Sequence, residues 1–390
     1  MKILLINKFL HPNGGAETYV FRLGEALKKL GHEVQYFGME HEDRMVGNRM
    51  NAYTANMDFR HARITQALKV IYSPEARRKI RMVLNDFRPD ICHLNNFNYQ
   101  LTPSILLEIC KWRRETGRIC KIFYTAHDYQ LVCPNHMCRS QSENCEACLN
   151  GHVWNCLRHK CIHDSLAKSL IGALEAAFWR RLGVYKQIDT IICCSRFMKT
   201  KLERHPHLAG RSVVMHNFVP KVPHNRMEPG EYVLYFGRFT REKGVATLAE
   251  AAQALPQIPF VFAGNGELTA QLEGIPNIRN AGFQTGEALE KLISHARFTV
   301  CPSEWYENCP FSVMESLSHG VPVLGAKIGG IPELISPGEN GALFESGNGK
   351  DLKEKLKQLW ETPIRCESPD FMAAEEYAQK LLTLYKEGAR

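Results

Sequence analysis

The chain has 390 residues, of which 44% are hydrophobic and 23% charged, and its 49 basic and 41 acidic residues give a formal net charge of +8. This length predicts two domains, and no apolar run approaches the roughly 20 residues that a membrane-spanning helix needs. Residues 1–10 predict a strand and not a signal peptide, so we expect a cytoplasmic protein. The modest positive charge favours an anionic small ligand or a membrane surface over a nucleic-acid groove.

The first 37 residues predict a βαβ unit. Residues 2–7 form an apolar strand pattern, Gly14 and Gly15 follow it, and a helical pattern at 19–30 leads to a second strand at 32–37. This order favours the α/β class, in which ligands bind beyond the carboxyl ends of the strands. Adjacent glycines there let backbone N–H groups approach a phosphate, although a glycine pair alone more often marks only a tight turn.

Residues 58–86 are basic and carry apolar residues at near-helical spacing. Such a run is usually the solvated face of an ordinary helix, and it also fits a surface that rests on anionic lipid headgroups. Residues 90–94 and 119–126 predict further strands, and the second ends beside His127. A histidine at the end of a strand, at the same edge as the glycine turn, can hydrogen-bond a ligand. A structural histidine is the competing interpretation.

A cysteine-rich stretch covers residues 133–163. Only Cys145 and Cys148 have the two-residue spacing of half a zinc knuckle, and two other pairs have the wider four-residue spacing. We favour one structural zinc over disulfides or free thiols, because cysteines in a reducing compartment bind metals more often than they form disulfides. The candidate ligands, of which only a subset would bind, are Cys133, Cys138, Cys145, Cys148, Cys156 and Cys161.

The first half ends with an amphipathic helix at 164–187, which packs on its domain or touches a membrane, and a strand at 189–194. Ser195 is placed to cap the following helix. Residues 219–230 are polar with three prolines and predict a linker. The second half repeats the α/β pattern, with strands predicted at 231–237 and 259–263. Arg238 and Lys243 surround a turn after the first of these strands, where two cations can clamp a diphosphate.

The stretch 307–320 follows a buried strand at 298–302 and predicts a helix over 311–319 that starts near Pro310 and stops at Gly320. Its first N–H groups, those of Phe311 and Ser312, would be ready to bind an anion. Two carboxylates, Glu307 before the helix and Glu315 one turn inside it, can reach one polar ligand. Taken alone, such a pair is more often solvated surface acids.

With these motifs in view, the chain resembles the retaining glycosyltransferases of family 4, which have the GT-B fold. The resemblance covers nearly the whole chain. It rests on the order and spacing of Gly14-Gly15-Ala16-Glu17, Gly237-Arg238 with Lys243-Gly244, Gly264-Asn265-Gly266, Glu307 with Glu315, and Gly329-Gly330-Ile331-Pro332-Glu333.

The resemblance implies two Rossmann-like domains that face a central cleft, an acceptor-side domain at 1–218 and a nucleotide-sugar-binding domain at 231–365. A helix in 366–390 would cross back to the first domain. The implied catalytic residues are His127, Arg238, Lys243 and Glu307. The implied donor-binding residues are Gly14, Gly15, Gly237, Arg238, Lys243, Asn265, Gly266, Phe283, Glu307, Asn308, Phe311, Ser312 and Glu315.

The implied reaction moves a sugar, with retention and without a catalytic metal, from a UDP- or GDP-sugar to a glycan or polyprenyl-linked acceptor. We expect a role in cell-surface polysaccharide or glycoconjugate synthesis, with the protein peripheral to the inner membrane face. Two features depart from the family pattern: Asn308 replaces a common glycine, and the cysteine-rich stretch is not general, so we expect it to shape acceptor binding.

Three other interpretations compete with this one. A dinucleotide-dependent oxidoreductase needs a G-x-G-x-x-G turn, whereas residues 12–17 read PNGGAE. A zinc-containing nucleic-acid-binding protein would need a basic recognition helix beside the cysteines, and the sequence predicts none there. A phosphorylase of the same fold remains an alternative, although no lysine is evidently committed to a pyridoxal cofactor.

Overall fold

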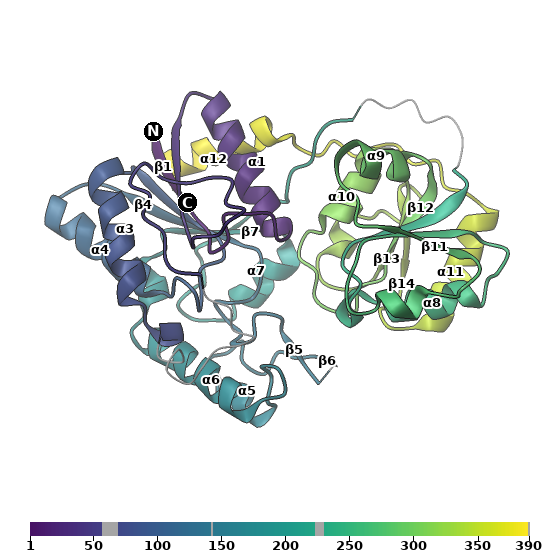
Figure 1. Ribbon diagram of the computed structural model, residues 1–390, viewed down its shortest axis with the longest axis horizontal. Coiled ribbons are helices and arrows are strands. Elements are labelled where there is room, and N and C mark those ends of the chain that lie inside the picture. The colour runs from purple at the N-terminus through teal and green to yellow at the C-terminus, as the bar shows by residue number, and fades with distance from the viewer. Residues whose placement is uncertain (57–68, 142, 223–229, 389–390) are drawn as a thin grey trace. The chain divides into compact units, whose positions relative to one another are not determined.

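The computed structural model describes residues 1–56, 69–141, 143–222 and 230–388. The chain forms two compact units (Figure 1). Unit 1 comprises Met1–His216 and Ala374–Arg390, and unit 2 comprises Asn217–Ala373. The sequence predicted a first domain at 1–218, a second at 231–365 and a return to the first domain at 366–390. Most of the predicted linker, at 223–229, lies outside the described residues.

Unit 1 is built on a six-stranded parallel sheet with the order β2-β1-β3-β4-β7-β8. The strands are β1 (Lys2–Ile6), β2 (Glu33–Phe37), β3 (Ile91–Leu94), β4 (Lys121–Ala126), β7 (Thr190–Cys193) and β8 (Ser212–Val214). Most of their residues are apolar and fully buried, which is expected of a parallel sheet that helices cover on both faces. The order reverses between β1 and β3, so a ligand is expected beyond the carboxyl ends of these two strands.

The helices of unit 1 flank this sheet (Figure 1). They are α1 (Gly15–Lys29), α3 (Pro74–Phe87), α4 (Ser104–Thr116), α5 (Asn155–Arg158), α6 (Leu166–Arg181), the 3-10 turn η2 (Val184–Gln187), α7 (Arg196–Leu202) and α12 (Ala374–Glu387). A serine side chain caps the N-termini of α3, α6 and α7, and the predicted cap Ser195 accepts from the N–H of Met198 at 3.0 Å. A two-stranded hairpin, β5 (Arg139–Ser140) and β6 (Glu143–Asn144), lies in the cysteine-rich stretch.

The last helix, α12, belongs to unit 1, which confirms the predicted return of the C-terminus to the first domain. It packs on α1, and the hydroxyl of Tyr377 lies 3.0 Å from that of Tyr19. The Tyr19 hydroxyl also contacts Thr125, which in turn bonds to Nε2 of His93 at 2.7 Å. The other ring nitrogen of His93 bonds to the hydroxyl of Tyr385 on α12. These fully buried polar groups satisfy one another and tie α12 to β3 and β4.

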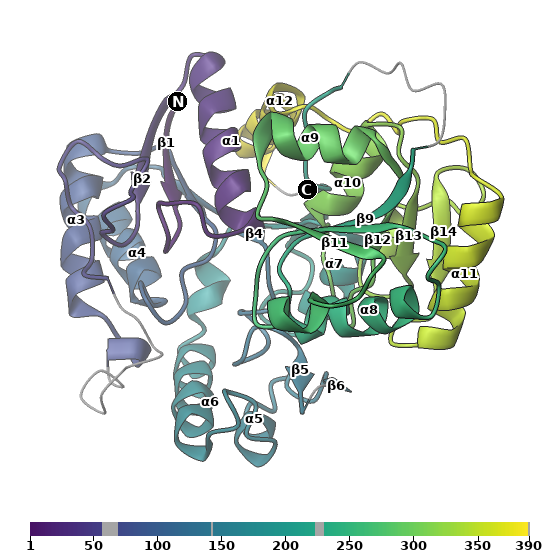
Figure 2. The same cartoon turned by 45° about the vertical axis from the view of Figure 1, so that its right-hand side comes forward.

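Unit 2 has a second six-stranded parallel sheet, with the order β11-β10-β9-β12-β13-β14. Its strands are β9 (Tyr232–Phe236), β10 (Phe260–Ala263), β11 (Ile278–Gly282), β12 (Ala296–Cys301), β13 (Val323–Ala326) and β14 (Gly341–Phe344). The helices on its two faces are α8 (Val245–Gln253), α9 (Gly286–Ser294), α10 (Phe311–Ser318) and α11 (Gly349–Glu361), as Figures 1 and 2 show. The strand order reverses between β9 and β12, so both units are Rossmann-like, as predicted.

Several predicted elements differ from the structure in their bounds. The helix after the glycine pair begins at Gly15 and not at residue 19. The helix predicted at 164–187 is broken at Gly183, whose φ of 61° is left-handed, so α6 is followed by the separate turn η2. Pro310 stands at the cap position of α10 and not inside the helix. Within the basic stretch 58–86, residues 58–68 lie outside the described residues, and α3 covers the end of the stretch.

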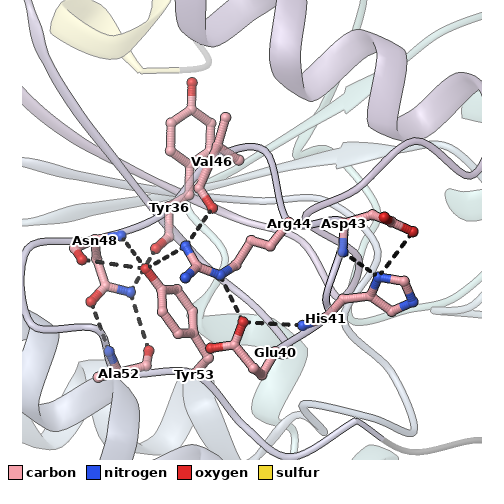
Figure 3. A network of polar contacts seen from close by, with 9 residues as sticks. All are labelled: Tyr36, Glu40, His41, Asp43, Arg44, Val46, Asn48, Ala52 and Tyr53. Carbon is pink, nitrogen blue, oxygen red and sulfur yellow. Dashed lines mark hydrogen bonds and ion pairs between the residues drawn. The ribbon is translucent and has the colours of Figure 1, made fainter.

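The loop after β2 is held by the network that Figure 3 shows. The hydroxyl of Tyr53 accepts hydrogen bonds from the backbone N–H of Asn48 at 2.9 Å and from Nη1 of Arg44 at 3.0 Å. The Arg44 guanidinium lies 4.0 Å from the centre of the Tyr53 ring. The loop then supports the segment after β1, because the N–H groups of Met39 and Met45 bond to the carbonyls of Lys8 and Leu10.

The buried histidine makes a testable prediction about stability. Burial lowers the pKa of His93 to about 3, so the folded protein keeps this ring neutral, whereas the unfolded chain protonates it below about pH 6.5. The unfolded state therefore binds the extra proton, and the free energy of unfolding falls as the pH drops from 6.5 towards 3. We expect His93→Gln to reduce this slope by up to about 1.4 kcal/mol per pH unit in urea unfolding of the full chain. Equal slopes in the two proteins would contradict the assignment.

Candidate active site

The candidate site of unit 2 lies where its strand order reverses. The chain after β9 carries Arg238 and Lys243, and the chain after β12 carries Ser303 and Glu307. Because β9 and β12 are neighbours that lead their connections to opposite sides, their carboxyl ends leave a crevice for a ligand. The fold therefore brings two predicted site residues from distant parts of the sequence to one point.

Lys243 and Glu307 form a direct ion pair there. One carboxylate oxygen of Glu307, Oε1, accepts from Nζ of Lys243 at 2.5 Å, from the hydroxyl of Ser303 at 2.8 Å and from Nε1 of Trp305 at 2.9 Å. Burial by itself would raise the pKa of Glu307, but the charge of Lys243 and these hydrogen bonds hold the pKa below its usual value. The carboxylate is therefore ionised at neutral pH. Its second oxygen, Oε2, accepts no hydrogen bond from the described residues.

Two glycines set the backbone on either side of this pair. Gly244 follows Lys243 with a φ of 69°, and a Cβ there would meet the carbonyl oxygen of Pro302 at 1.9 Å. Gly329 has a φ of 59°, and a Cβ there would meet the carbonyl oxygen of Glu307 at 2.2 Å. Both positions combine a left-handed backbone with close approach of another segment, so only glycine fits without movement. The N–H of Gly330 also donates to the carbonyl of Glu307 at 2.7 Å, which fixes the loop that carries this acid.

Helix α10 begins beside Glu307. The N–H groups of Phe311 and Ser312 lie at its first two positions and find no acceptor within the described chain. They leave the positive end of the helix dipole open at the edge of the sheet. Glu315 lies half-buried one turn inside the helix, as predicted from the sequence.

The other predicted donor-binding residues of unit 2 all follow the carboxyl ends of its strands. Arg238 is exposed, and its Nη2 lies 3.8 Å from the Glu242 carboxylate. Asn265 accepts from the N–H of Phe239 through its backbone carbonyl at 2.8 Å, which joins the loops after β9 and β10. Phe283, directly after β11, is 70% exposed, so its ring lies in solvent rather than in the core. The remaining members are Gly237 after β9, Gly266 after β10 and Asn308 after β12.

In unit 1, His127 lies directly after β4. Its Nε2 donates to Oδ1 of Asn95, the residue after β3, at 2.9 Å, and its ring meets the edge of Tyr19 with centroids 4.8 Å apart. Burial lowers the pKa of His127 to about 4, although the Asp128 carboxylate acts in the other direction. The imidazole is therefore neutral at pH 7, and it hydrogen-bonds rather than carries charge.

Polar residues that the sequence reasoning missed lie near His127. Burial lowers the pKa of Lys8, which follows β1, against the opposing charges of Asp128 and Glu17. Glu17 on α1 is buried and accepts from the side chain of Asn7 at 2.9 Å. Gly14 and Gly15 begin α1 at the same edge of the sheet and are exposed. Asn7, Lys8 and Asn95 follow β1 and β3, the two strands between which the strand order reverses. This position could have identified them from the sequence.

Five of the six clustered cysteines line one small cavity of ≈ 10 Å³, and all six are free thiols. The lining cysteines are Cys133, Cys145, Cys148, Cys156 and Cys161. A hydrogen bond from the Cys156 thiol lowers the pKa of Cys161 to about 6. No group of three or more histidine, cysteine or acidic side chains among the described residues is arranged to hold a metal ion. Zinc binding therefore stays a prediction, and it would require these thiols to draw closer together.

Two Rossmann-like units, each built on a parallel sheet, define the GT-B fold. Two family models match the chain: Glycosyltransferase Family 4 over residues 13–221, more than half of the chain, and Glycosyl transferases group 1 over residues 221–380. The protein belongs to Glycosyltransferase Family 4 and is a glycosyltransferase of group 1. No helix in the described parts of the chain is long and apolar enough to cross a membrane.

The chain is also similar to curated proteins in sequence and to solved structures in fold. An uncharacterized glycosyltransferase of Methanocaldococcus jannaschii is 27% identical over 51% of this chain, and the match spans 57% of that relative. An uncharacterized 42.6 kDa protein from the cps region of Klebsiella pneumoniae is 23% identical over 86% of this chain and 87% of its own. The crystal structure of Anabaena HepE in complex with UDP and glucose matches with a TM-score of 0.68 at 16% identity, covering 99% of this chain and 100% of that one.

The ion pair predicts a double-mutant cycle. Lys243→Met leaves the buried Glu307 carboxylate without its countercharge, so we expect about 3 kcal/mol of lost unfolding free energy. The double variant Lys243→Met/Glu307→Gln removes both charges and should regain much of that loss. Urea unfolding of the full chain at neutral pH gives the free energy of unfolding of the wild type, of Lys243→Met, of Glu307→Gln and of the double variant. Additive losses would show that the two side chains are not energetically coupled.

The cysteine cluster predicts stoichiometric zinc. Six of the ten non-glycine residues with positive φ among the described residues fall between His136 and Asp164, which is a strained backbone that an added ligand would help to fix. We expect one zinc per chain by elemental analysis, less in Cys148→Ser, and a lower melting temperature with a chelator. The matched control is Cys366→Ser, which lies outside the cluster. A protein that contains no zinc and whose melting temperature does not change with a chelator would exclude a structural zinc.

Proposed function

We propose that this protein transfers a sugar from a nucleotide-diphosphate-sugar to a glycan or lipid-linked acceptor, with retention of the anomeric configuration. The Lys243–Glu307 pair at the reversal point of unit 2 carries this proposal. It places a cation, an ionised carboxylate with one oxygen open to a hydroxyl, and two open N–H groups at one edge of the sheet. A ligand with both a diphosphate and sugar hydroxyls matches this combination of groups.

Each group has a distinct part in the proposed reaction. The donor diphosphate binds Arg238, Lys243 and the N–H groups of Phe311 and Ser312, which stabilise the negative charge that grows on the leaving phosphate. Glu307 accepts a hydrogen bond from a sugar hydroxyl through Oε2, and Glu315 accepts from the ribose. Two cations and a helix end supply this stabilisation, so the proposed transfer needs no catalytic metal. Attack on the same face as the departing phosphate would retain the configuration.

The residues of unit 1 complete the proposal. A neutral His127 held by Asn95 can hydrogen-bond a sugar hydroxyl without repelling the cations that hold the phosphates. Gly14 and Gly15, which are exposed at the start of α1, would bind the donor through their backbone N–H groups. The cysteine-rich stretch begins six residues after His127, so we propose that it contributes to acceptor binding.

We propose a UDP-sugar as the donor, with a GDP-sugar as the alternative, and polysaccharide or glycoconjugate synthesis as the setting. Support for UDP comes from HepE, whose structures are complexes with UDP, UDP with glucose, and UDP-glucose. Support for the setting comes from the Klebsiella relative of the cps region. The nucleic-acid-binding and phosphorylase alternatives have no comparable support.

A nucleotide screen tests the donor site. We expect one nucleoside diphosphate among UDP, GDP and ADP to raise the melting temperature, because a ligand at a hundredfold excess over its Kd adds about 2.7 kcal/mol to the stability. Glu315→Ala should lose most of this shift if it holds the ribose, and Lys243→Ala should lose it through the diphosphate. The matched control is Arg241→Ala, which removes an exposed cation from the same turn. A folded protein that no nucleotide stabilises would refute the proposed function.

A further inference from the structure

Helix α6 has polar and charged residues on its buried side and large apolar residues on its exposed side. Its buried side carries Ser169, Glu175 and Arg180 beside Trp179 and small residues, whereas its exposed side carries large apolar residues together with Lys168 and Arg181. Two of these buried groups have partners in unit 1: Ser169 accepts from the N–H of Ile162 at 3.0 Å, and the Arg180 guanidinium bonds to the carbonyls of Val132 and Cys148. One carboxylate oxygen of Glu175 is buried without a hydrogen-bond partner among the described residues. The usual driving force for helix docking, an apolar face turned inwards, is therefore not the whole reason for this orientation.

The exposed face presents one continuous apolar row. Its members follow each other at i, i+4 spacing and form a single ridge of the helix surface. They are between 40% and 57% exposed, and they make up five of the eleven large exposed hydrophobic residues in the described chain. The row consists of Leu166, Leu170, Leu174, Phe178 and Leu182. Single exposed leucines are ordinary, but a contiguous row of this length marks an interaction surface.

The row ends at a cationic cavity. Leu182 lines a cavity of ≈ 640 Å³ that α3, α4 and η2 enclose, and five cations and one acid contribute to its wall. The cations are Arg77, Lys111, Arg113, Arg114 and Lys186. Arg77 pairs with Glu108, Lys111 with Glu115 and Arg113 with Asp189. Arg114 and Lys186 form no ion pair with the described residues, so the cavity keeps a net positive charge.

The cavity lies at the edge of the sheet opposite the candidate active-site residues of unit 1, and the apolar row of α6 runs towards it from the cysteine-rich stretch. Helix α4 leads into the start of β4, and η2 leads into the start of β7, whereas His127 follows the end of β4. The 3-10 turn η2 contacts both α4 and α6, so the cavity and the apolar row are continuous. Figure 2 shows the whole length of α6 together with α5 along one border of unit 1. A partner can therefore cover this surface and leave the carboxyl ends of the strands accessible.

We propose that this surface, the apolar row of α6 with the adjoining cationic cavity, docks unit 1 on a membrane that contains anionic lipids. The row enters the layer below the headgroups, and Arg114 and Lys186 contact lipid phosphates. An apolar helix ridge that ends in cations is the pattern of an interfacial helix, and charge complementarity selects an anionic lipid surface over a neutral one. This inference is independent of the proposed donor chemistry.

The basic stretch 58–86 predicted a membrane contact from sequence, and the structure shows which of its described cations are paired within unit 1. In α3, the guanidinium of Arg77 is held by Glu108, and that of Arg81 by Glu108 and Glu115. These pairs join α3 to α4, so the two arginines are committed to packing within unit 1. The exposed Arg78 of α3 and the cations of α4 and η2 remain for lipid.

Vesicle co-sedimentation tests the proposal. The wild-type chain should bind vesicles with roughly 30% phosphatidylglycerol in phosphatidylcholine and should be partly released at about 0.5 M salt. Leu170→Gln/Phe178→Gln and Arg114→Gln/Lys186→Gln should each weaken binding roughly tenfold or more. The matched control Lys350→Gln/Lys353→Gln removes two exposed cations from α11 of unit 2 and should bind as the wild type does. Melting temperatures of all four proteins establish that they are folded.

Three results would overturn the proposal. The first is a wild-type chain that binds no vesicle, and the second is a Leu170→Gln/Phe178→Gln variant that binds as tightly as the wild type. The third is a lipid-free dimer in light scattering that this variant dissociates, because the row would then be covered by a second copy of the chain. None of these results depends on nucleotide binding, so a failure here and a failure of the nucleotide screen are distinguishable.

Discussion

The architecture of unit 2 depends on keeping one charged carboxylate buried at the edge of its sheet. Removing a charge from water costs several kcal/mol, and only a close countercharge with further hydrogen bonds offsets this cost. Glu307 obtains both on a single oxygen, from Lys243, Ser303 and Trp305. This arrangement requires β9 and β12 to be neighbours, and it requires glycine at 244 and 329, where other segments pass within contact distance. All three donors bond to Oε1, and no described residue donates a hydrogen bond to Oε2.

In unit 1, the buried histidines are kept neutral instead of being paired with a countercharge. Burial keeps His93 and His127 unprotonated, and hydroxyl groups from both ends of the chain share their hydrogen bonds. Because Tyr377 and Tyr385 come from α12, the core of unit 1 is complete only after the chain has finished unit 2.

The sequence predicted the fold class, most of the strands and the cap at Ser195, because apolar runs and glycine turns are local signals. It also predicted Lys243 and Glu307 as site residues, but not their direct contact, since 64 positions separate them and only the strand order brings them together. Ser303 and Trp305 lie four and two residues before Glu307, and they were missed because no sequence pattern shows that their side chains turn towards its carboxylate. The break at Gly183 and the exposure of the apolar row of α6 were missed. Periodicity reveals an apolar stripe but not whether that stripe faces the core or the solvent. The membrane contact of the basic stretch stays a prediction, and charge counts did not reveal the ion pairs of Arg77 and Arg81.

A parallel sheet has two unlike edges, and unit 1 uses them differently. At the carboxyl ends of its strands, loops collect polar side chains such as Asn7, Asn95 and His127, which suit a small polar ligand. At the opposite edge, helices end before the strands begin, and cations in their last turns offset the helix dipoles. Arg113 and Arg114 occupy such positions in α4, and Arg181 does so in α6. The same rule that stabilises these helix ends therefore gathers positive charge beside the apolar row of α6. A membrane-docking surface at this edge follows from ordinary helix capping electrostatics together with one helix whose apolar side faces outwards.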